Sequence, residues 1–596
     1  MKKTNWLVLT LTGTALACLA SACGSSGDET PGSGGSSGSG AGVAGAPAGG
    51  ASGAAGSGAG TSGAGAMSGA SGAGAGASGA SSGAAGVGAG GASGSGGLGG
   101  AGAAGIAGSA GNGGISGDAG SAGAAGTAGT AGMPPVVRPG VVTSGAGAYW
   151  QEGTLTEASG AATVTVNASQ TFQEWIGFGG TFNEAGWDAL SELSASDRDR
   201  AIRLLFSASE GANFKWGRIP IGASDYAMDR YTLNETANDY TMTNFSIERD
   251  RLRLLPYVQA AQAVKGDIRF WASPWTPPTW MKDPAEFDAT DGGPNGSPAA
   301  TYEAYMKDDE QTLTAYALYL ARWVEEWELE GVPIDSIMPQ NEPGYSTRYP
   351  SCRWAAGLLG EFVGDYLGPT FEQRNLDTDI WFGTLSNNDA AVYSGNIGGL
   401  TGTAEDYAVG VGLQWNTMEH TGELVDRGYL VMQTEHRCGN YPFTVQGAPP
   451  FNPDMPQNDH AYAVESWGYL RAWIEEGVHS YSAWNMVLDT VGKNLDDQRP
   501  WPQNALLIVN RETNTLIETP AYYVFRHLSY FVDPGATRVG VTGGNALAFA
   551  NPDGSIVAVL HNSASQPAPT TVAMGGKTYS VDIPAQGFAT LFHHEG

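Results

Sequence analysis

The sequence predicts an α/β fold, a (β/α)8 TIM barrel with a C-terminal β-sandwich side domain that an N-terminal strand completes. Eight short apolar segments alternate with stretches whose apolar residues recur every three or four positions, which is typical of a parallel barrel. The predicted barrel strands are 175–179, 214–219, 268–272, 336–340, 380–384, 408–413, 430–434 and 479–483. Strand patterns at 163–166 and after residue 546, separated by Gly-Gly and Asn-Pro-Asp-Gly turns, predict the sandwich.

The first 135 residues carry neither pattern. Two lysines and an apolar run lead to Leu19-Ala20-Ser21-Ala22-Cys23, which is typical of a lipoprotein signal peptide over 1–23. Residues 24–135 are almost wholly Gly, Ala and Ser, so we expect a disordered tether that buries no core. We therefore expect an exported cell-envelope lipoprotein, at the outer membrane or cell surface, lipidated at Cys23. Plain secretion is the alternative.

The remaining chain is expected to hold the barrel over 160–515 and the sandwich over 516–596. The formal net charge of -30 falls almost entirely here, and an acidic surface argues against nucleic acid as a partner. No ligand cluster implies a metal or a cofactor, and the oligomeric state is left open. Cys352 and Cys438 are both expected in loops on one barrel face, where export would permit a disulfide, with two free thiols as the alternative.

Two glutamates stand at the ends of predicted strands. Glu342 lies in Gln340-Asn341-Glu342-Pro343, and Glu435 follows Thr434 at the end of an apolar run. The carboxyl ends of barrel strands are where catalytic side chains lie. Hydrolysis of a glycosidic bond needs one carboxyl to protonate the leaving oxygen and a second one across the sugar ring. The pair therefore indicates a glycosidase, although Asn-Glu-Pro alone is also an ordinary turn.

Several motifs, in this order, resemble glycoside hydrolase family 30 of clan A, in particular bacterial members of its glucosylceramidase-like branch. They are Phe178-Gly179-Gly180, the segments 218–225 and 272–282, Gln340-Asn341-Glu342-Pro343, Thr434-Glu435 and the segment 484–489. The resemblance extends from about residue 163 through 522–536 to the C-terminus. It implies a retaining β-glycosidase that cleaves β-glucosidic bonds by double displacement, with Glu342 as acid/base and Glu435 as nucleophile. A retaining pair has carboxyl groups about 5–5.5 Å apart.

The resemblance also implies substrate-binding residues. Asn341 would bond the sugar 2-hydroxyl, and Asp225 would hold sugar hydroxyls as in glucose-specific members, with a helix cap as its alternative. Trp275, Trp415 and Trp484 follow predicted strands 3, 6 and 8, where an indole can stack on a pyranose or simply pack in the core.

One departure from the family concerns the segment after predicted strand 6. The family commonly has His-Trp-Tyr there, whereas this chain has Gln414-Trp415-Asn416, so we expect altered hydrogen bonding around the nucleophile. The substrate is expected to be a carbohydrate or a glycolipid, which would include glucosylceramide and sphingolipid metabolism. An endo-β-1,6-glucanase or a xylan-directed hydrolase of the same family remains an alternative. A non-catalytic surface carbohydrate-binding protein is the alternative from another class.

Overall fold

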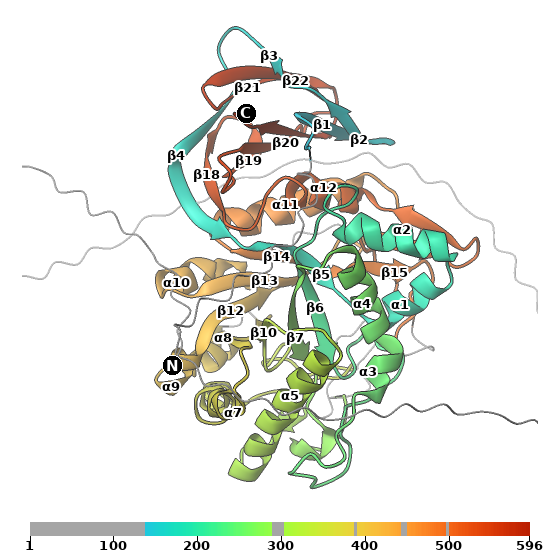
Figure 1. The fold of residues 1–596 in the computed structure, drawn as a ribbon, viewed down its shortest axis with the longest axis vertical. Helices are drawn as coiled ribbons and strands as arrows, with labels where there is room; N and C mark the ends of the chain where they lie inside the picture. The colour runs from blue at the N-terminus through green and yellow to red at the C-terminus, as the bar shows by residue number, and fades with distance from the viewer. Residues whose placement is uncertain (1–136, 289–302, 387–389, 443–449, 496–499, 596) are drawn as a thin grey trace, which may run out of the picture. The chain divides into compact units, whose positions relative to one another are not determined.

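A computed structural model describes residues 137–288, 303–386, 390–442, 450–495 and 500–595 (Figure 1). The predicted signal peptide, tether and lipidation site at Cys23 lie outside these residues. Eight parallel strands close into a barrel in the order β10-β11-β12-β13-β14-β5-β6-β7, so the barrel prediction is confirmed. These strands are β5 (Gly177–Thr181), β6 (Trp216–Ile221), β7 (Arg269–Pro274), β10 (Ser336–Ile337), β11 (Asp379–Leu385), β12 (Ala408–Gln414), β13 (Leu430–His436) and β14 (Ser480–Asn485).

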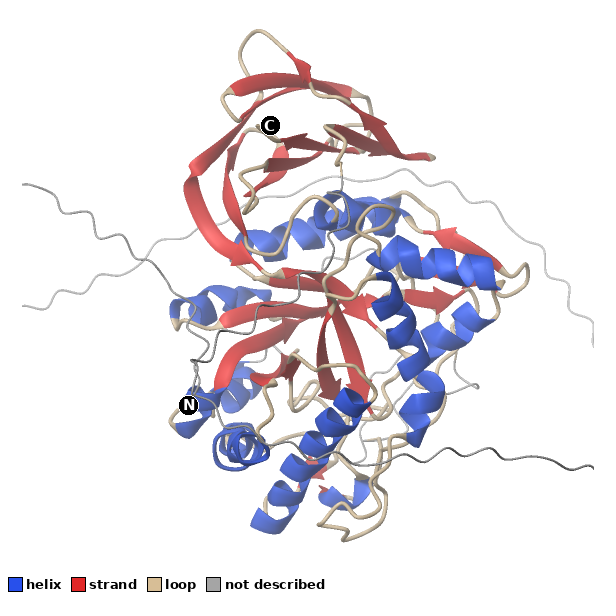
Figure 2. Ribbon diagram, in the orientation of Figure 1, coloured by secondary structure: helices blue, strands red, loops and turns tan. Residues whose placement is uncertain are grey.

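Helices lie outside the barrel strands (Figure 2). The longest α-helix among the described residues is α5 (Glu310–Leu329), which begins where the Asp309 side chain accepts a hydrogen bond from the Thr312 amide, as an N-cap does. Its inner face buries Trp323 and Trp327. The other α-helices are α1 (Glu184–Ser191), α2 (Ala195–Phe206), α3 (Glu248–Arg253), α4 (Leu255–Val264), α6 (Leu358–Glu361), α7 (Gly368–Arg374), α8 (Ala390–Ile397), α9 (Thr403–Tyr407), α10 (Thr421–Asp426), α11 (Ala461–Glu476) and α12 (Pro520–Ser529). Short 3-10 turns at Thr279–Met281 and Met418–His420 and a π-helical turn at Phe362–Leu367 complete the helical elements described.

The sandwich domain is built from one ten-stranded sheet that curls around its own core, in the order β2-β1-β23-β20-β19-β18-β4-β21-β22-β3. The predicted strand at 163–166 lies in β4 (Val164–Trp175), which runs from the sandwich toward the first barrel strand. Three further N-terminal strands join the sheet, β1 (Val141–Gly145), β2 (Ala148–Gly153) and β3 (Thr156–Glu157). The C-terminal members are β18 (Ala536–Thr542), β19 (Asn545–Ala550), β20 (Ile556–His561), β21 (Ala568–Met574), β22 (Lys577–Ile583) and β23 (Phe588–His593).

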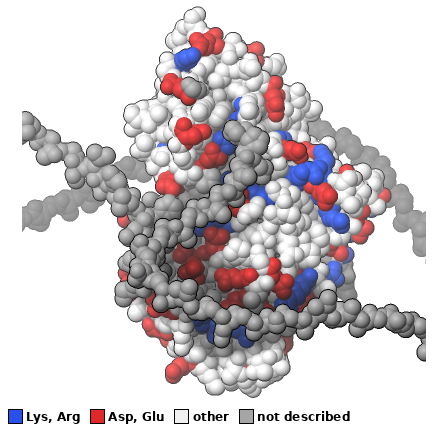
Figure 3. Space-filling view, viewed as in Figure 1, with Lys and Arg blue, Asp and Glu red and all other residues white. Residues whose placement is uncertain are grey.

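Two small sheets lie among the barrel loops. β15 (Val487–Asp489), β16 (Leu507–Asn510) and β17 (Thr515–Glu518) form one, and β8 (Lys282–Asp283) with β9 (Tyr305–Met306) forms the other. Acidic and basic side chains are interspersed over the face drawn in Figure 3. No helix within the described ranges is both long and apolar enough to span a membrane.

Candidate active site

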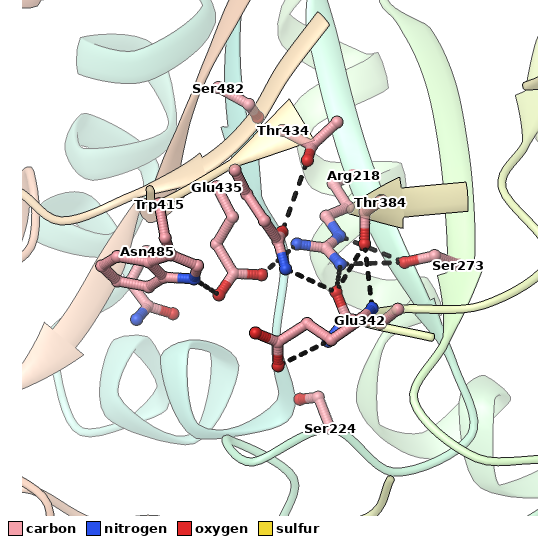
Figure 4. A network of polar contacts seen from close by, with 12 residues as sticks. Arg218, Ser224, Ser273, Glu342, Thr384, Trp415, Thr434, Glu435, Ser482 and Asn485 are labelled. Carbon is pink, nitrogen blue, oxygen red and sulfur yellow. Dashed lines mark hydrogen bonds and ion pairs between the residues drawn. The ribbon is translucent and has the colours of Figure 1, made fainter. Parts of the chain in front are cut away.

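The barrel brings the two strand-end glutamates into one buried site. Glu342 follows β10 and is 8 % exposed, whereas Glu435 belongs to β13 and is 4 % exposed. Figure 4 shows both carboxyl groups pointing into the same space beside Arg218. The backbone of Glu342 has a φ of 48°, a left-handed conformation that is uncommon outside glycine and often occurs at functional sites.

Arg218 links the two glutamates. Its guanidinium is fully buried and forms an ion pair with Glu435, with 2.5 Å between Nη1 and Oε2. Nη2 donates to Asn341 Oδ1 at 2.7 Å, and Asn341 Nδ2 in turn donates to Glu342 Oε2 at 3.4 Å. Ser273 Oγ accepts from Nε at 3.2 Å and from Nη2 at 3.0 Å. The Arg218 guanidinium, which extends from β6, therefore contacts both Asn341, which follows β10, and Glu435, which lies in β13.

The loop after β10 supplies a second contact to Glu342. Tyr349 Oη donates to Glu342 Oε2 at 3.0 Å. Farther along this loop, the backbone oxygen of Ser351 accepts from the buried ammonium of Lys282 at 2.9 Å, and that ammonium also donates to the oxygen of Phe287 at 3.0 Å. Lys282 thus ties the loops after β7 and β10 together near the residue that contacts Glu342.

The electrostatics distinguish the two carboxyls. Burial raises the pKa of Glu342 and that of Glu435, and the charge of Glu342 raises the pKa of Glu435 further. Glu435 is in direct ion contact with Arg218, which favours its charged form, whereas Tyr349 and Asn341 are neutral donors to Glu342. The direct ion pair with Arg218 therefore favours the charged form of Glu435, whereas burial and the charge of Glu342 oppose it and raise the pKa of Glu435 to about 7.

Asp225 is a buried residue in the loop after β6, close enough to Glu435 and Glu342 for their charges to act on it. It lines a pocket together with Arg230, Arg348, Tyr349, Asn494, Leu495 and Trp501. Its Oδ1 is buried and has no hydrogen-bond partner among the described groups. Burial, and then the charges of Glu435 and Glu342, raise the pKa of Asp225 well above its ordinary value. An unpaired buried carboxyl oxygen is suited to a sugar hydroxyl, because leaving such a group unpaired is costly.

The three predicted tryptophans occupy different positions. Trp275 and Trp484 stack on each other with ring centroids 5.5 Å apart, and the Arg218 guanidinium lies 4.3 Å from the Trp275 ring. Both indoles are almost fully buried. Trp415 follows β12 and directs its indole Nε1 at Glu435 Oε1, 3.1 Å away.

Of the two alternatives left open for Cys352 and Cys438, the structure has the free thiols, and both are buried. Their surroundings differ: Cys352 lies near the Lys282 ammonium, and Cys438 lies near the Glu465 carboxylate. Burial raises the pKa of the Cys352 thiol to about 12, which disfavours the reactive thiolate form. Within the described ranges, no group of three His, Cys, Asp or Glu is arranged to hold a metal ion.

Comparison with known proteins agrees with this geometry. The model of the glycosyl hydrolase family 30 TIM-barrel domain matches residues 175–444, and the model of the family 30 beta sandwich domain matches residues 535–591. The chain belongs to glycoside hydrolase family 30. It is a glycoside hydrolase with β-glycosidase function, and its substrate is a carbohydrate or glycolipid.

Relatives and solved structures cover most of both domains. The chain is 27% identical to putative glucosylceramidase 1 of Caenorhabditis elegans over 445 residues, 69% of this chain and 78% of that protein. It is 26% identical to the endo-1,6-beta-D-glucanase BGN16.3 of Trichoderma harzianum, over 66% of this chain and 78% of that protein. The crystal structure of SrfJ from Salmonella typhimurium superposes with a TM-score of 0.65 at 19% identity, over 76% of this chain and 99% of that one. This likeness shows the shared fold.

The structure brings the sequence-predicted residues together and adds two more. Asn341, Asp225 and the two glutamates share the site, but Arg218 and Tyr349 were not predicted as site residues. A signal for Arg218 was available, because it is the charged residue within the wholly buried strand Trp216–Ile221. A buried arginine needs an ionic or hydrogen-bonding partner, which predicts a carboxylate nearby. Tyr349 lies in a loop, where no periodicity marks it.

Proposed function

We propose that this family 30 enzyme hydrolyses β-glucosides with retention of configuration, using Glu342 as general acid/base and Glu435 as nucleophile. The observation that carries the assignment is the division of contacts between the two carboxyls. Glu435 is paired with the Arg218 guanidinium at 2.5 Å, whereas Glu342 accepts hydrogen bonds from neutral groups. A nucleophile must be ionised and a general acid must be protonated, and these contacts favour that distribution.

The reaction then takes two steps. In the first step, Glu435 attacks the anomeric carbon while Glu342 gives its proton to the departing glycosidic oxygen, which leaves a glycosyl ester on Glu435. In the second step, Glu342 takes a proton from water, the resulting hydroxide equivalent attacks the anomeric carbon, and the Glu435 carboxylate leaves. Two inversions give net retention.

Asp225 supports glucose as the sugar. Asp225 lines a pocket together with Tyr349, and a sugar hydroxyl would supply the hydrogen bond that its buried Oδ1 lacks among the described groups. The two relatives described above are named for glucosylceramide and for a β-1,6-glucan, and both names refer to glucosyl substrates. We therefore propose a β-glucoside as the substrate class, with glucosylceramide and β-1,6-glucan as the first candidates. Measuring kcat/KM on both, alongside β-xylan and an aryl β-xyloside, discriminates among them, and preference for a xylose substrate would overturn the glucoside proposal.

The test of the two roles uses Glu342→Ala and Glu435→Ala on aryl and alkyl β-glucosides. Glu342→Ala should lose far less activity on an aryl glucoside with a good leaving group, because that group departs without a proton. Azide should rescue Glu342→Ala with retention and Glu435→Ala with inversion. Glu419→Ala is the matched control, because this exposed glutamate of a 3-10 turn should be dispensable. The opposite stereochemistry would reverse the roles, and full activity in Glu342→Ala or Glu435→Ala would remove that residue from the mechanism.

We also propose that the enzyme is anchored to the cell envelope through lipidated Cys23. The small residues Ala20, Ser21 and Ala22 before this cysteine support the proposal. Cys23→Ala should move the enzyme from the membrane to the soluble fraction with unchanged specific activity, because the barrel begins more than a hundred residues later. Retention of the variant in the membrane fraction would contradict it.

A further inference from the structure

Each carboxylate oxygen of Glu435 accepts from a different donor. The Arg218 Nη1 donor holds Oε2 at 2.5 Å, and the Trp415 Nε1 donor holds Oε1 at 3.1 Å (Figure 4). The Trp415 contact is made by the indole edge. Stacking on a sugar would instead use a face of the ring. The hydrogen bond to Glu435 therefore indicates a second role for Trp415, separate from stacking.

The backbone after β12 fixes the direction of this indole. Trp415 has a φ of 53°, in the left-handed region, and its amide points at the Glu435 backbone oxygen, 3.4 Å away. The Thr417 hydroxyl stabilises the turn through one hydrogen shared between the backbone oxygens of Leu385, 2.9 Å away, and Gln414, 2.8 Å away. A strained conformation held by such contacts is typical of a functional constraint.

The ring is also held from its sides. Its centroid lies 5.5 Å from that of His436 and 5.0 Å from that of Tyr441, both in tilted contacts. These neighbours limit rotation of the indole about its side-chain bonds. The N–H is therefore pre-positioned toward Glu435 before substrate arrives, which avoids reorganisation during the reaction.

We propose that Trp415 is a positioning residue for the nucleophile, which orients the Glu435 carboxylate through the indole N–H and stabilises its anionic form. This inference rests on the proposed role of Glu435. The carboxylate is an anion before attack, becomes a neutral ester in the intermediate, and is an anion again when water displaces it. The N–H therefore stabilises the resting nucleophile and, in the second step, the departing carboxylate.

Two replacements test the N–H. Trp415→Phe removes it together with part of the ring, whereas 3-(1-benzothiophen-3-yl)alanine at position 415 keeps the bicyclic shape and replaces N–H by sulfur. A hydrogen bond to a charged group corresponds to about one unit of pKa or more, so the acidic limb of the kcat/KM profile should move up by about one pH unit in both variants. With 2,4-dinitrophenyl β-glucoside, whose first step is fast, kcat should fall about tenfold because the second step slows.

The control is Trp467→Phe, which removes an indole N–H bonded to Asn545 Oδ1 at 2.9 Å and not to either glutamate. This variant should keep the pH profile. A wild-type profile in the benzothienylalanine enzyme would overturn the inference, because ring shape alone would then suffice. Failure of the proposed function is distinguishable, since Glu435→Ala would then remain active whatever Trp415 does.

Discussion

Replacement of Arg218 by glutamine should show how much its buried guanidinium contributes to the ionisation of Glu435 and to the stability of the protein. The ion pair with Glu435 joins side chains that are 0% and 6% exposed, so it belongs to the class of buried pairs in which removal of one partner costs about 3–5 kcal/mol. If about 3 kcal/mol of this cost is lost stabilisation of the ionised form of Glu435, the pKa of Glu435 rises by about two units in the variant. Because the pKa of Glu435 is already raised to about 7, a further rise of about two units should move the acidic limb of kcat/KM up accordingly and lower activity at neutral pH about fiftyfold.

The same change predicts a pH-dependent loss of stability. Burial already raises the pKa of Glu435 above its unfolded value of about 4.5, and loss of Arg218 raises it further. A carboxyl with a raised folded-state pKa destabilises the native state progressively as pH rises above the unfolded pKa, because folding must then bury or neutralise a charge. The free energy of unfolding of Arg218→Gln should therefore fall farther below wild type at pH 8 than at pH 5. Urea denaturation at the two pH values measures this difference.

Arg437→Gln is the matched control for the activity profile. Arg437 forms a comparably buried ion pair with Glu465 at 2.6 Å, but no contact joins it to the Glu435 carboxylate among the described interactions. This variant should lose stability while its acidic limb stays in place. An unshifted limb in Arg218→Gln, together with equal destabilisation at pH 5 and pH 8, would refute the assigned linkage between Arg218 and Glu435.

Three further outcomes follow from described contacts. Tyr349→Phe removes a donor that lowers the pKa of Glu342, so the basic limb of kcat/KM should move to higher pH, and a downward move would contradict the assignment. Lys282→Met removes the two hydrogen bonds that connect the loops after β7 and β10. The free energy of unfolding, measured in urea, should fall by about 1–3 kcal/mol. Wild-type stability would contradict a structural contribution from these hydrogen bonds. Peptide mass spectrometry after alkylation in non-reducing denaturant should find Cys352 and Cys438 both alkylated, whereas a disulfide would leave both unmodified.

The sequence predicted those features that depend on local pattern. All eight barrel strands were located because each is a short apolar segment between helical ones, and the strand-end rule then placed Glu342 and Glu435 on one face. Strands β1–β3 were missed for the opposite reason. β2 and β3 are mostly exposed and lack alternation, and β1 owes its pairing to β23 at the far end of the chain.

The close contacts of the site depend on barrel closure and could not be derived from spacing. Arg218 and Glu435 are 217 residues apart, and their ion pair forms because β6 and β13 face one interior. The hydrogen bond from Trp415 likewise depends on a left-handed backbone at a tryptophan, which no residue preference predicts. The sequence indicated altered bonding around the nucleophile from Gln414-Trp415-Asn416, but it could not indicate which atom would serve as the donor.

In the proposed mechanism, the coupling between the two glutamates also explains how Glu342 can act first as an acid and then as a base. The charge of Glu342 raises the pKa of Glu435, and because such an interaction is mutual, the charge of Glu435 raises the pKa of Glu342. In the proposed mechanism, Glu342 is protonated while Glu435 is an anion. Once Glu435 is esterified its charge is gone, so the pKa of Glu342 falls just after its proton has been donated. The ionised Glu342 can then deprotonate water, and departure of the Glu435 carboxylate restores the charge that makes Glu342 an acid again.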